Sequence, residues 1–200
     1  PSNTVAVWLG PGHVQEFYRG IPNCMVIDSE NEDAKHRLVQ AFSSDLIRFY
    51  YGGDMIGNEV GAAAKNVVGI AAGFLDGVEM SSLKGALMSR GTREVARLIR
   101  AMGGNELSAY GLCHLGDYEA TVFSPYSHNR QFGESFIRHQ DYHRLAEGYY
   151  TVEALMVLSE RYQVELPICK AVHAILYESA DPREQLTELL RRGLRAEFDD

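Results

Sequence analysis

Cysteine is scarce in this 200-residue chain. The three cysteines, Cys24, Cys113 and Cys169, are far apart and odd in number. Their spacing matches neither a zinc-binding pattern nor a disulfide framework. We therefore expect no metal site and a reducing, cytoplasmic setting.

Long apolar runs and excess positive charge are also lacking. No uninterrupted apolar stretch has the length of a bilayer span, so we expect neither membrane insertion nor a signal peptide. The 19 Lys and Arg residues are outnumbered by 27 Asp and Glu residues, which gives a formal net charge of −8. This balance argues against broad binding to nucleic acids or to anionic membranes. An anionic ligand would need a local positive site.

The hydrophobic content of 46% is that of an ordinary globular protein, and its distribution changes along the chain. Short apolar runs predict strands at 4–9, 24–28 and 46–52, with a helix at 29–44 capped by Ser29 or Asn31. Later segments predict helices at 56–76, 81–102, 106–112, 130–138, 150–162, 168–177 and 182–192. The pattern thus predicts a small α/β part, residues 1–54, followed by an all-α domain, residues 55–200.

The stretch GNEVGAAAKNVVGIAAGFLDG, residues 57–77, is built almost entirely of small or β-branched residues, yet Lys65 and Asn66 lie in its middle. Helical spacing puts on one face Gly61, Lys65, Gly69, Ala72 and Gly73. Small residues allow another backbone or a ligand to approach closely. A lysine in that groove needs solvent, a carboxylate or an anionic ligand. The residues leave open a structural ion pair and a site lysine whose lowered pKa suits proton transfer.

A second unusual stretch is LGDYEATVFSPYSHNRQFGESF, residues 115–136. It combines an acid, hydroxyls, an amide and basic residues, a mixture that can hold a phosphate or a polyol. The segment SPYS breaks a helix and predicts a loop. On its own, the stretch is equally compatible with a polar connector.

Together, these stretches resemble the NAD(P)-dependent glycerol-3-phosphate dehydrogenases. The resemblance runs through LGPGHVQEFYRGIPNCMVI, IGNEVGAAAKNVVGIAAGFLDG, LMSRGTREVARLIRAMGG, GLCHLGDYEAT, SHNRQFG and AEGYYTVEALMVLSERYQVELPI, in the family's order and spacing. It implies a mainly α fold: a helical domain like the C-terminal domain of 6-phosphogluconate dehydrogenase, preceded by a short α/β remnant of a Rossmann domain. It also implies conversion of sn-glycerol 3-phosphate to dihydroxyacetone phosphate, which supplies glycerophospholipid synthesis, with NAD or NADP as cofactor.

The resemblance also implies roles for individual residues. Lys65 matches the catalytic lysine that exchanges a proton with the C2 hydroxyl, and Asp117 matches the acid that helps to hold it. The implied substrate contacts are Gly10, Lys65, Asn66, Asp117, Thr121, Ser127, His128 and Asn129. The implied cofactor contacts are Val14, His128, Leu145 and Glu147. No metal is implied.

Departures from the family pattern bear on the substrate. The phosphate-binding triplet Ser-Arg-Asn reads Ser127-His128-Asn129 here, and imidazole neither grips phosphate bidentately nor stays charged at neutral pH. Arg130 is an alternative cation. Gly12 stands where the family has a hydroxyl. A relative acting on another hydroxy acid or polyol therefore stays open, as does a non-catalytic binding or oligomerisation module.

The Gly-rich dinucleotide fingerprint of the family is absent from the sequence. GPGHVQE supplies G-x-G, but Gln15 stands at the third glycine's position and no βαβ unit of its own follows. We expect a fragment of a full enzyme or a truncated homologue, inactive with the cofactor on its own. We further expect a homodimer, and self-association or disorder at the sheet edges formed by 4–9 or 46–52.

Overall fold

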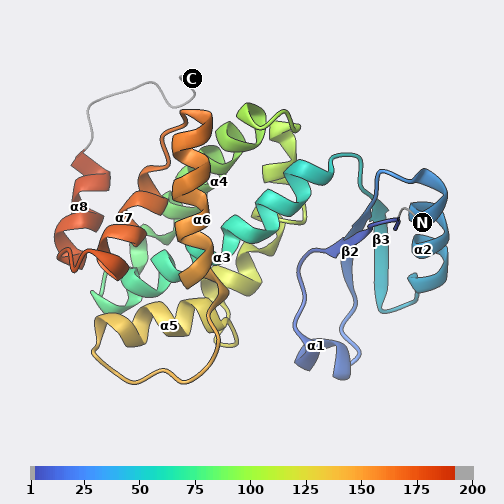
Figure 1. The fold of residues 1–200 in the computed structure, drawn as a ribbon. Helices are drawn as coiled ribbons and strands as arrows, with labels where there is room; N and C mark the ends of the chain where they lie inside the picture. Colours follow the sequence, from blue (N-terminus) through green and yellow to red (C-terminus); the bar gives the residue numbers. More distant parts are fainter. Residues whose placement is uncertain (1–2, 192–200) are drawn as a thin grey trace.

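Figure 1 shows a small sheet beside a larger group of helices, in a computed structural model that describes residues 3–191 of the chain. The mainly α fold expected from the sequence is confirmed. The predicted helix at 182–192 corresponds to α8 (Pro182–Arg191), and residue 192 lies outside the described residues.

The sheet consists of β1 (Val7–Leu9), β2 (Asn23–Asp28) and β3 (Ile47–Tyr51), in that spatial order. The pair β1–β2 is antiparallel, whereas β2–β3 is parallel. The connection from β1 contains α1 (Val14–Tyr18), and the crossover to β3 is α2 (Glu32–Phe42). Asn31 caps α2 by accepting a hydrogen bond from the Ala34 amide at 2.8 Å, which confirms one of the two predicted caps.

The helical part follows from Met55 onward. Its long helices are α3 (Met55–Gly77), α4 (Lys84–Ala101), α5 (His128–Ile137), α6 (Glu147–Tyr162), α7 (Pro167–Tyr177) and α8. Short 3₁₀ turns are η1 (Ser81–Leu83), η2 (Glu106–Tyr110) and η3 (Leu115–Asp117), and η4 (Glu119–Phe123) is a π-helical turn. Helices α5 and α6 begin two and three residues earlier than predicted, and the predicted helix at 106–112 is the 3₁₀ turn η2.

Helix α3 runs through the centre of the molecule, between the sheet and the other helices (Figure 1). Its side chains Val67, Ile70 and Phe74 have no exposed surface and form the middle of the main apolar core. A separate small core of Ile27, Val39 and Phe49 joins α2 to the sheet. Within residues 3–191, no helix combines the length and apolarity needed to cross a membrane.

Glycines on α3 allow α5 to pack against it backbone to backbone. A Cβ added at Gly73 would lie 2.1 Å from the Arg130 carbonyl oxygen, and one added at Gly133 would lie 2.3 Å from the Ile70 carbonyl oxygen. A Cβ at Gly69 would lie 2.8 Å from Thr121 Cγ2. The small-residue face predicted from the sequence therefore does permit close approach, and the partner there is the chain itself.

Asp28, at the end of β2, connects the sheet to the start of α3. Its carboxylate is buried and accepts hydrogen bonds from the amides of Ser29 and Asp54 at 2.8 and 2.9 Å and from Asn58 Nδ2 at 2.7 Å. Asp54 in turn accepts from the Asn105 amide and the Ser108 hydroxyl at 2.9 and 2.6 Å. Two carboxylates thus hold the first turn of α3 against the sheet on one side and η2 on the other.

The contact between α3 and α5 gives a stability prediction. Gly73→Ala places a methyl group against the backbone of α5, so the two helices must separate, and we expect a loss of about 1–3 kcal/mol or more in the free energy of unfolding. Gly85→Ala, in α4, is the matched control because nothing lies within 4 Å of its added Cβ. There we expect a gain of up to about 1 kcal/mol from helix propensity. Urea unfolding measures both; equal changes in the two variants would contradict this account of the contact.

Candidate active site

Lys65 lies in the middle of α3 and its ammonium donates a hydrogen bond to Asp117 Oδ2, at the end of η3. The side chains are 20% and 4% exposed, respectively. The predicted pairing of Lys65 with a carboxylate is therefore confirmed, across 52 residues of sequence. Their roles in catalysis stay predictions.

Burial lowers the pKa of Lys65 from its usual value of 10.5, and the negative charge of Glu147 partly opposes this effect. A lysine with a lowered pKa loses its proton more easily than one in water. At the same time, the adjacent carboxylate stabilises the ammonium form. Lys65 can therefore both accept and return a proton, which is what a general acid–base group requires.

An amide network joins the neighbouring helices beside Lys65. Asn129 Nδ2, on α5, lies 3.1 Å from Asn66 Oδ1 on α3 and 3.3 Å from Glu147 Oε2 at the start of α6. Asn129 Oδ1 accepts a hydrogen bond from the Gly148 amide at 2.9 Å. Four polar residues or backbone groups from three helices thus meet at one place, although the sequence separates them widely.

Thr121 is buried in the π-helical turn η4, and its methyl group packs at Gly69, one helical turn after Lys65. The loop predicted at SPYS, residues 124–127, is confirmed, since η4 ends at Phe123 and α5 begins at His128. The sequence did not predict the turns η3 and η4 that precede this loop. Single π-helical turns occur frequently at functional sites, since the extra residue re-aims side chains.

Ser127 is the N-cap of α5, and its hydroxyl accepts a hydrogen bond from the Arg130 amide at 3.3 Å. His128 is the first residue of this helix and is exposed, whereas Ser127 and Asn129 are buried. The predicted triplet therefore occupies a helix N-terminus, where backbone N–H groups and the helix dipole favour an anion.

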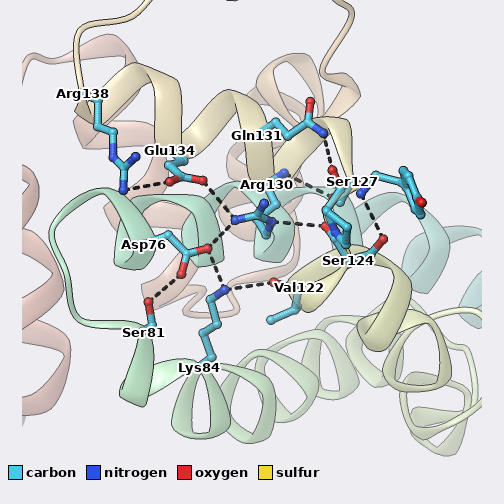
Figure 2. Close-up of polar contacts among 12 residues, drawn as sticks. Asp76, Ser81, Lys84, Val122, Ser124, Ser127, Arg130, Gln131, Glu134 and Arg138 are labelled. Atoms are coloured by element: carbon cyan, nitrogen blue, oxygen red, sulfur yellow. Dashed lines mark hydrogen bonds and ion pairs between the residues drawn. The ribbon is translucent and has the colours of Figure 1, made fainter.

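Arg130 points away from this N-terminus into an ion-pair cluster (Figure 2). Its Nη1 lies 2.7 Å from Asp76 Oδ2 and 3.1 Å from Glu134 Oε2, and its Nε donates to the Ser124 carbonyl at 3.2 Å. Its Nε and Nη1 are thus committed within the protein, and this orientation does not support Arg130 as the alternative phosphate ligand. Sequence reasoning missed Asp76 as a site-related residue, because its partner lies 54 residues later.

Two titratable side chains near Lys65, those of His114 and Cys113, are neutral at neutral pH. Burial lowers the pKa of His114 to about 4, and burial raises the pKa of the Cys113 thiol to about 12. Neutral His114 bridges the Gly61 carbonyl at 2.9 Å and the Tyr118 hydroxyl at 2.6 Å. No positive charge on His114 competes with Lys65 for Asp117 at neutral pH. Among residues 3–191, no group of three or more His, Cys, Asp or Glu side chains is arranged to hold a metal ion.

The remaining predicted residues lie around this cluster or at the surface. Gly10 follows β1 with a φ of 130°, and the His13 ring close by lies 5.5 Å, edge to face, from the Tyr126 ring. This contact brings the loop after β1 beside the turn before α5. Val14 and Leu145 are 63% and 62% exposed. Their predicted contacts with a dinucleotide, and those of His128 and Glu147, stay predictions.

Comparison with known proteins shows the family to which this chain is similar. The model of the NAD-dependent glycerol-3-phosphate dehydrogenase C-terminus matches residues 54–187. The glycerol-3-phosphate dehydrogenase [NAD(P)+] of Thermus thermophilus is 39% identical over 96% of this chain and 62% of its own length. Glycerol-3-phosphate dehydrogenase [NAD(P)+] 1 of Salinibacter ruber is 35% identical over 98% and 60%.

Solved structures agree with this match. The crystal structure of glycerol-3-phosphate dehydrogenase from Coxiella burnetii superposes with a TM-score of 0.89 at 31% identity, covering 94% of this chain and 61% of that one. The structure of the Plasmodium falciparum enzyme shares the fold, with a TM-score of 0.79 at 17% identity. This chain thus spans about three fifths of the length of these relatives. The chain belongs to the NAD-dependent glycerol-3-phosphate dehydrogenase family, whose C-terminal domain it contains.

Proposed function

We propose that this chain is the substrate-binding and proton-transferring part of an enzyme that interconverts sn-glycerol 3-phosphate and dihydroxyacetone phosphate. The observation that carries the proposal is the largely buried pair formed by Lys65 on α3 and Asp117 at the end of η3. By resemblance, these residues match the catalytic lysine and acid of the family. The nearby amides of Asn66 and Asn129 support it, because they offer polar contacts for a hydroxylated substrate.

In this proposal, Lys65 Nζ takes the proton of the C2 hydroxyl when the alcohol is oxidised and returns it when the ketone is reduced. The oxidised cofactor supplies the acceptor for the hydride that leaves C2. Asp117 holds Lys65 in place and stabilises its charged form after it has taken the proton. The phosphate group of the substrate faces the N-terminus of α5, where Ser127 and His128 lie.

Residues 3–191 do not provide all the contacts that would hold a dinucleotide. The Gly10–Gly12 turn leads into α1, a helix of only five residues, which is too short to serve as a pyrophosphate cradle. Val14, His128, Leu145 and Glu147 would touch the cofactor at most from one side. We therefore propose that NAD or NADP is held chiefly by a dinucleotide-binding domain, and that catalysis requires this domain together with the present chain.

We also propose that the protein works as a homodimer in a reducing, cytoplasmic compartment. Three free cysteines support the compartment. In the isolated chain, β1 and β3 are the two edges of the sheet within residues 3–191, and Tyr50 and Tyr51 on β3 are 46% and 50% exposed. Both edge strands are formed, so we expect the isolated chain to associate there. Sedimentation equilibrium should give twice the mass of one chain; a monomer at all concentrations would contradict the proposal.

The acid–base role of Lys65 predicts a pH profile. Oxidation needs neutral Lys65, so kcat/KM for glycerol 3-phosphate should rise with pH to a midpoint below 10.5, because burial lowers the pKa of this group. Lys65→Met should reduce the rate about 10²–10⁴-fold, whereas Lys170→Met, at an exposed position on α7, should not. The assay uses this chain joined to a dinucleotide-binding domain of the family.

Asp117→Asn tests the same role through the position of the midpoint. Removing the carboxylate withdraws the charge that stabilises the ammonium, so the pKa of Lys65 should fall and the midpoint should move to lower pH. Asp45→Asn, at an exposed loop position, controls for the loss of one negative charge. An unchanged midpoint in Asp117→Asn would assign the pH profile to another group.

His128 decides how tightly a phosphate is held. An imidazole cannot bind a phosphate in the bidentate geometry of a guanidinium, so His128 should hold this group less tightly than an arginine would. His128→Arg should therefore lower the Kd for glycerol 3-phosphate. His143→Arg, at an exposed position outside the triplet, should leave it unchanged. If His128→Arg binds glycerol and its phosphate equally well, the substrate of this chain carries no phosphate.

A further inference from the structure

A single carboxylate, Asp76, holds two cations from different helices at the far end of α3 (Figure 2). Asp76 Oδ2 lies 2.7 Å from Lys84 Nζ, at the start of α4, and 2.7 Å from Arg130 Nη1 on α5. Its Oδ1 accepts a hydrogen bond from the Ser81 hydroxyl at 2.6 Å. The side chains of Asp76, Lys84 and Arg130 are 12%, 9% and 16% exposed, so the cluster is largely shielded from water.

Both cations also bind the chain segment that leads into the candidate active site. Lys84 Nζ donates to the Val122 carbonyl at 3.2 Å, and Arg130 Nε donates to the Ser124 carbonyl at 3.2 Å. This segment begins directly after Thr121 and ends at Ser127, the N-cap of α5. Figure 2 shows the two contacts, one from Lys84 on α4 and one from Arg130 on α5.

The hydrogen bonds from Lys84 to the Val122 carbonyl and from Arg130 to the Ser124 carbonyl depend on the negative charge of Asp76. Lys84 and Arg130 share one carboxylate oxygen, so without that charge two buried cations would face each other and repel. Burial by itself would raise the pKa of Asp76, but hydrogen bonds from Lys84, Ser81 and Arg130 outweigh it and lower the pKa. Asp76 therefore stays ionised at neutral pH.

Glu134, a second carboxylate at Arg130, does not replace Asp76. Glu134 contacts Arg130 at 3.1 Å, but it also pairs with Arg138 at 2.9 Å on the outer side of α5, away from Lys84. Gln131 holds the Pro125 carbonyl from α5, which fixes the tip of the turn and not its two ends. Asp76 therefore contacts both cations that hold the segment: Lys84, which binds its start, and Arg130, which binds the Ser124 carbonyl.

We propose that Asp76 is a positioning residue for the substrate: through Lys84 and Arg130 it fixes the Val122–Ser127 segment and thereby the side chains that receive the phosphate end. The proposal rests on the function proposed above and adds a residue that makes no contact with substrate. Asp76 lies on the same helix as Lys65, so one rigid element sets the position of both ends of the substrate.

The test is Asp76→Asn in this chain joined to a dinucleotide-binding domain. We expect KM for glycerol 3-phosphate to rise about tenfold, since a misplaced loop weakens one charge-assisted contact. The KM for the cofactor and the pH midpoint assigned to Lys65 should not change. Asp45→Asn is the matched control. The parameters are measured at a temperature where circular dichroism shows the variant to be folded, and an unchanged substrate KM there would overturn the proposal.

A second variant, Arg130→Lys, keeps a positive charge next to Asp76. It therefore tests the hydrogen bond to the Ser124 carbonyl without leaving a charge unpaired. A single ammonium cannot reach Asp76 and the Ser124 carbonyl in the fork geometry of the guanidinium. We expect the same rise in substrate KM as in Asp76→Asn. Adding Asp76→Asn to Arg130→Lys should raise KM less than it does in the parent protein, because both changes release the same segment. If Asp76→Asn raised KM by the same factor in both backgrounds, the two residues would not hold the segment jointly, and the proposal would be overturned.

Amide hydrogen exchange separates this proposal from the function on which it rests. Exchange at residues 122–127 should be faster in Asp76→Asn than in the parent protein, with no change in α2, whether or not glycerol 3-phosphate is the substrate. Faster exchange in Asp76→Asn, together with a parent protein that is inactive on glycerol 3-phosphate, would overturn the proposed function and retain the anchor. Unchanged exchange in the variant would overturn the anchor itself.

Discussion

Helices α3 and α5 touch backbone to backbone at Gly73 and Gly133, and the candidate site depends on that contact. Because no side chain fits between them, the distance between the two helices is set by van der Waals contact of main-chain atoms. Lys65 and Asn66 are carried by one of these helices, and Asn129 by the other. The close contact therefore translates directly into the position of the amide network beside the lysine.

The polar groups around Lys65 are a compromise between stability and chemistry. A buried ammonium is costly, and Asp117 offsets that cost without eliminating it, since the pKa of Lys65 remains lowered. A second carboxylate, Glu147, lies at the exposed start of α6, where water screens it. Tighter pairing would stabilise the fold further, but it would also hold the proton more firmly than the proposed acid–base role of Lys65 allows.

Much of this arrangement could be predicted from the sequence, for reasons that differ by residue. The helix α3 and the position of Lys65 on its small-residue face could be predicted from the run of small residues, because helical spacing is a local property. Asp117 is 52 residues away, and only the family resemblance predicted it as the partner. The turns η3 and η4 were missed because a π-helical turn leaves no periodic pattern. Arg130 was an open alternative for binding phosphate; its partner Asp76, on another helix, decided its orientation, and no local pattern reports such a pairing.

The carboxylate of Asp28 has a consequence for motion between the two parts of the molecule. It accepts hydrogen bonds from Ser29 on the sheet side and from Asp54 and Asn58 on the helix side, all while buried. Rotation of α3 against β2 would strip a buried anion of its donors, at a cost of several kcal/mol. These hydrogen bonds therefore make the connection between β2 and α3 rigid. Any opening and closing around a ligand has to bend the chain elsewhere and leaves α3 aligned with the sheet.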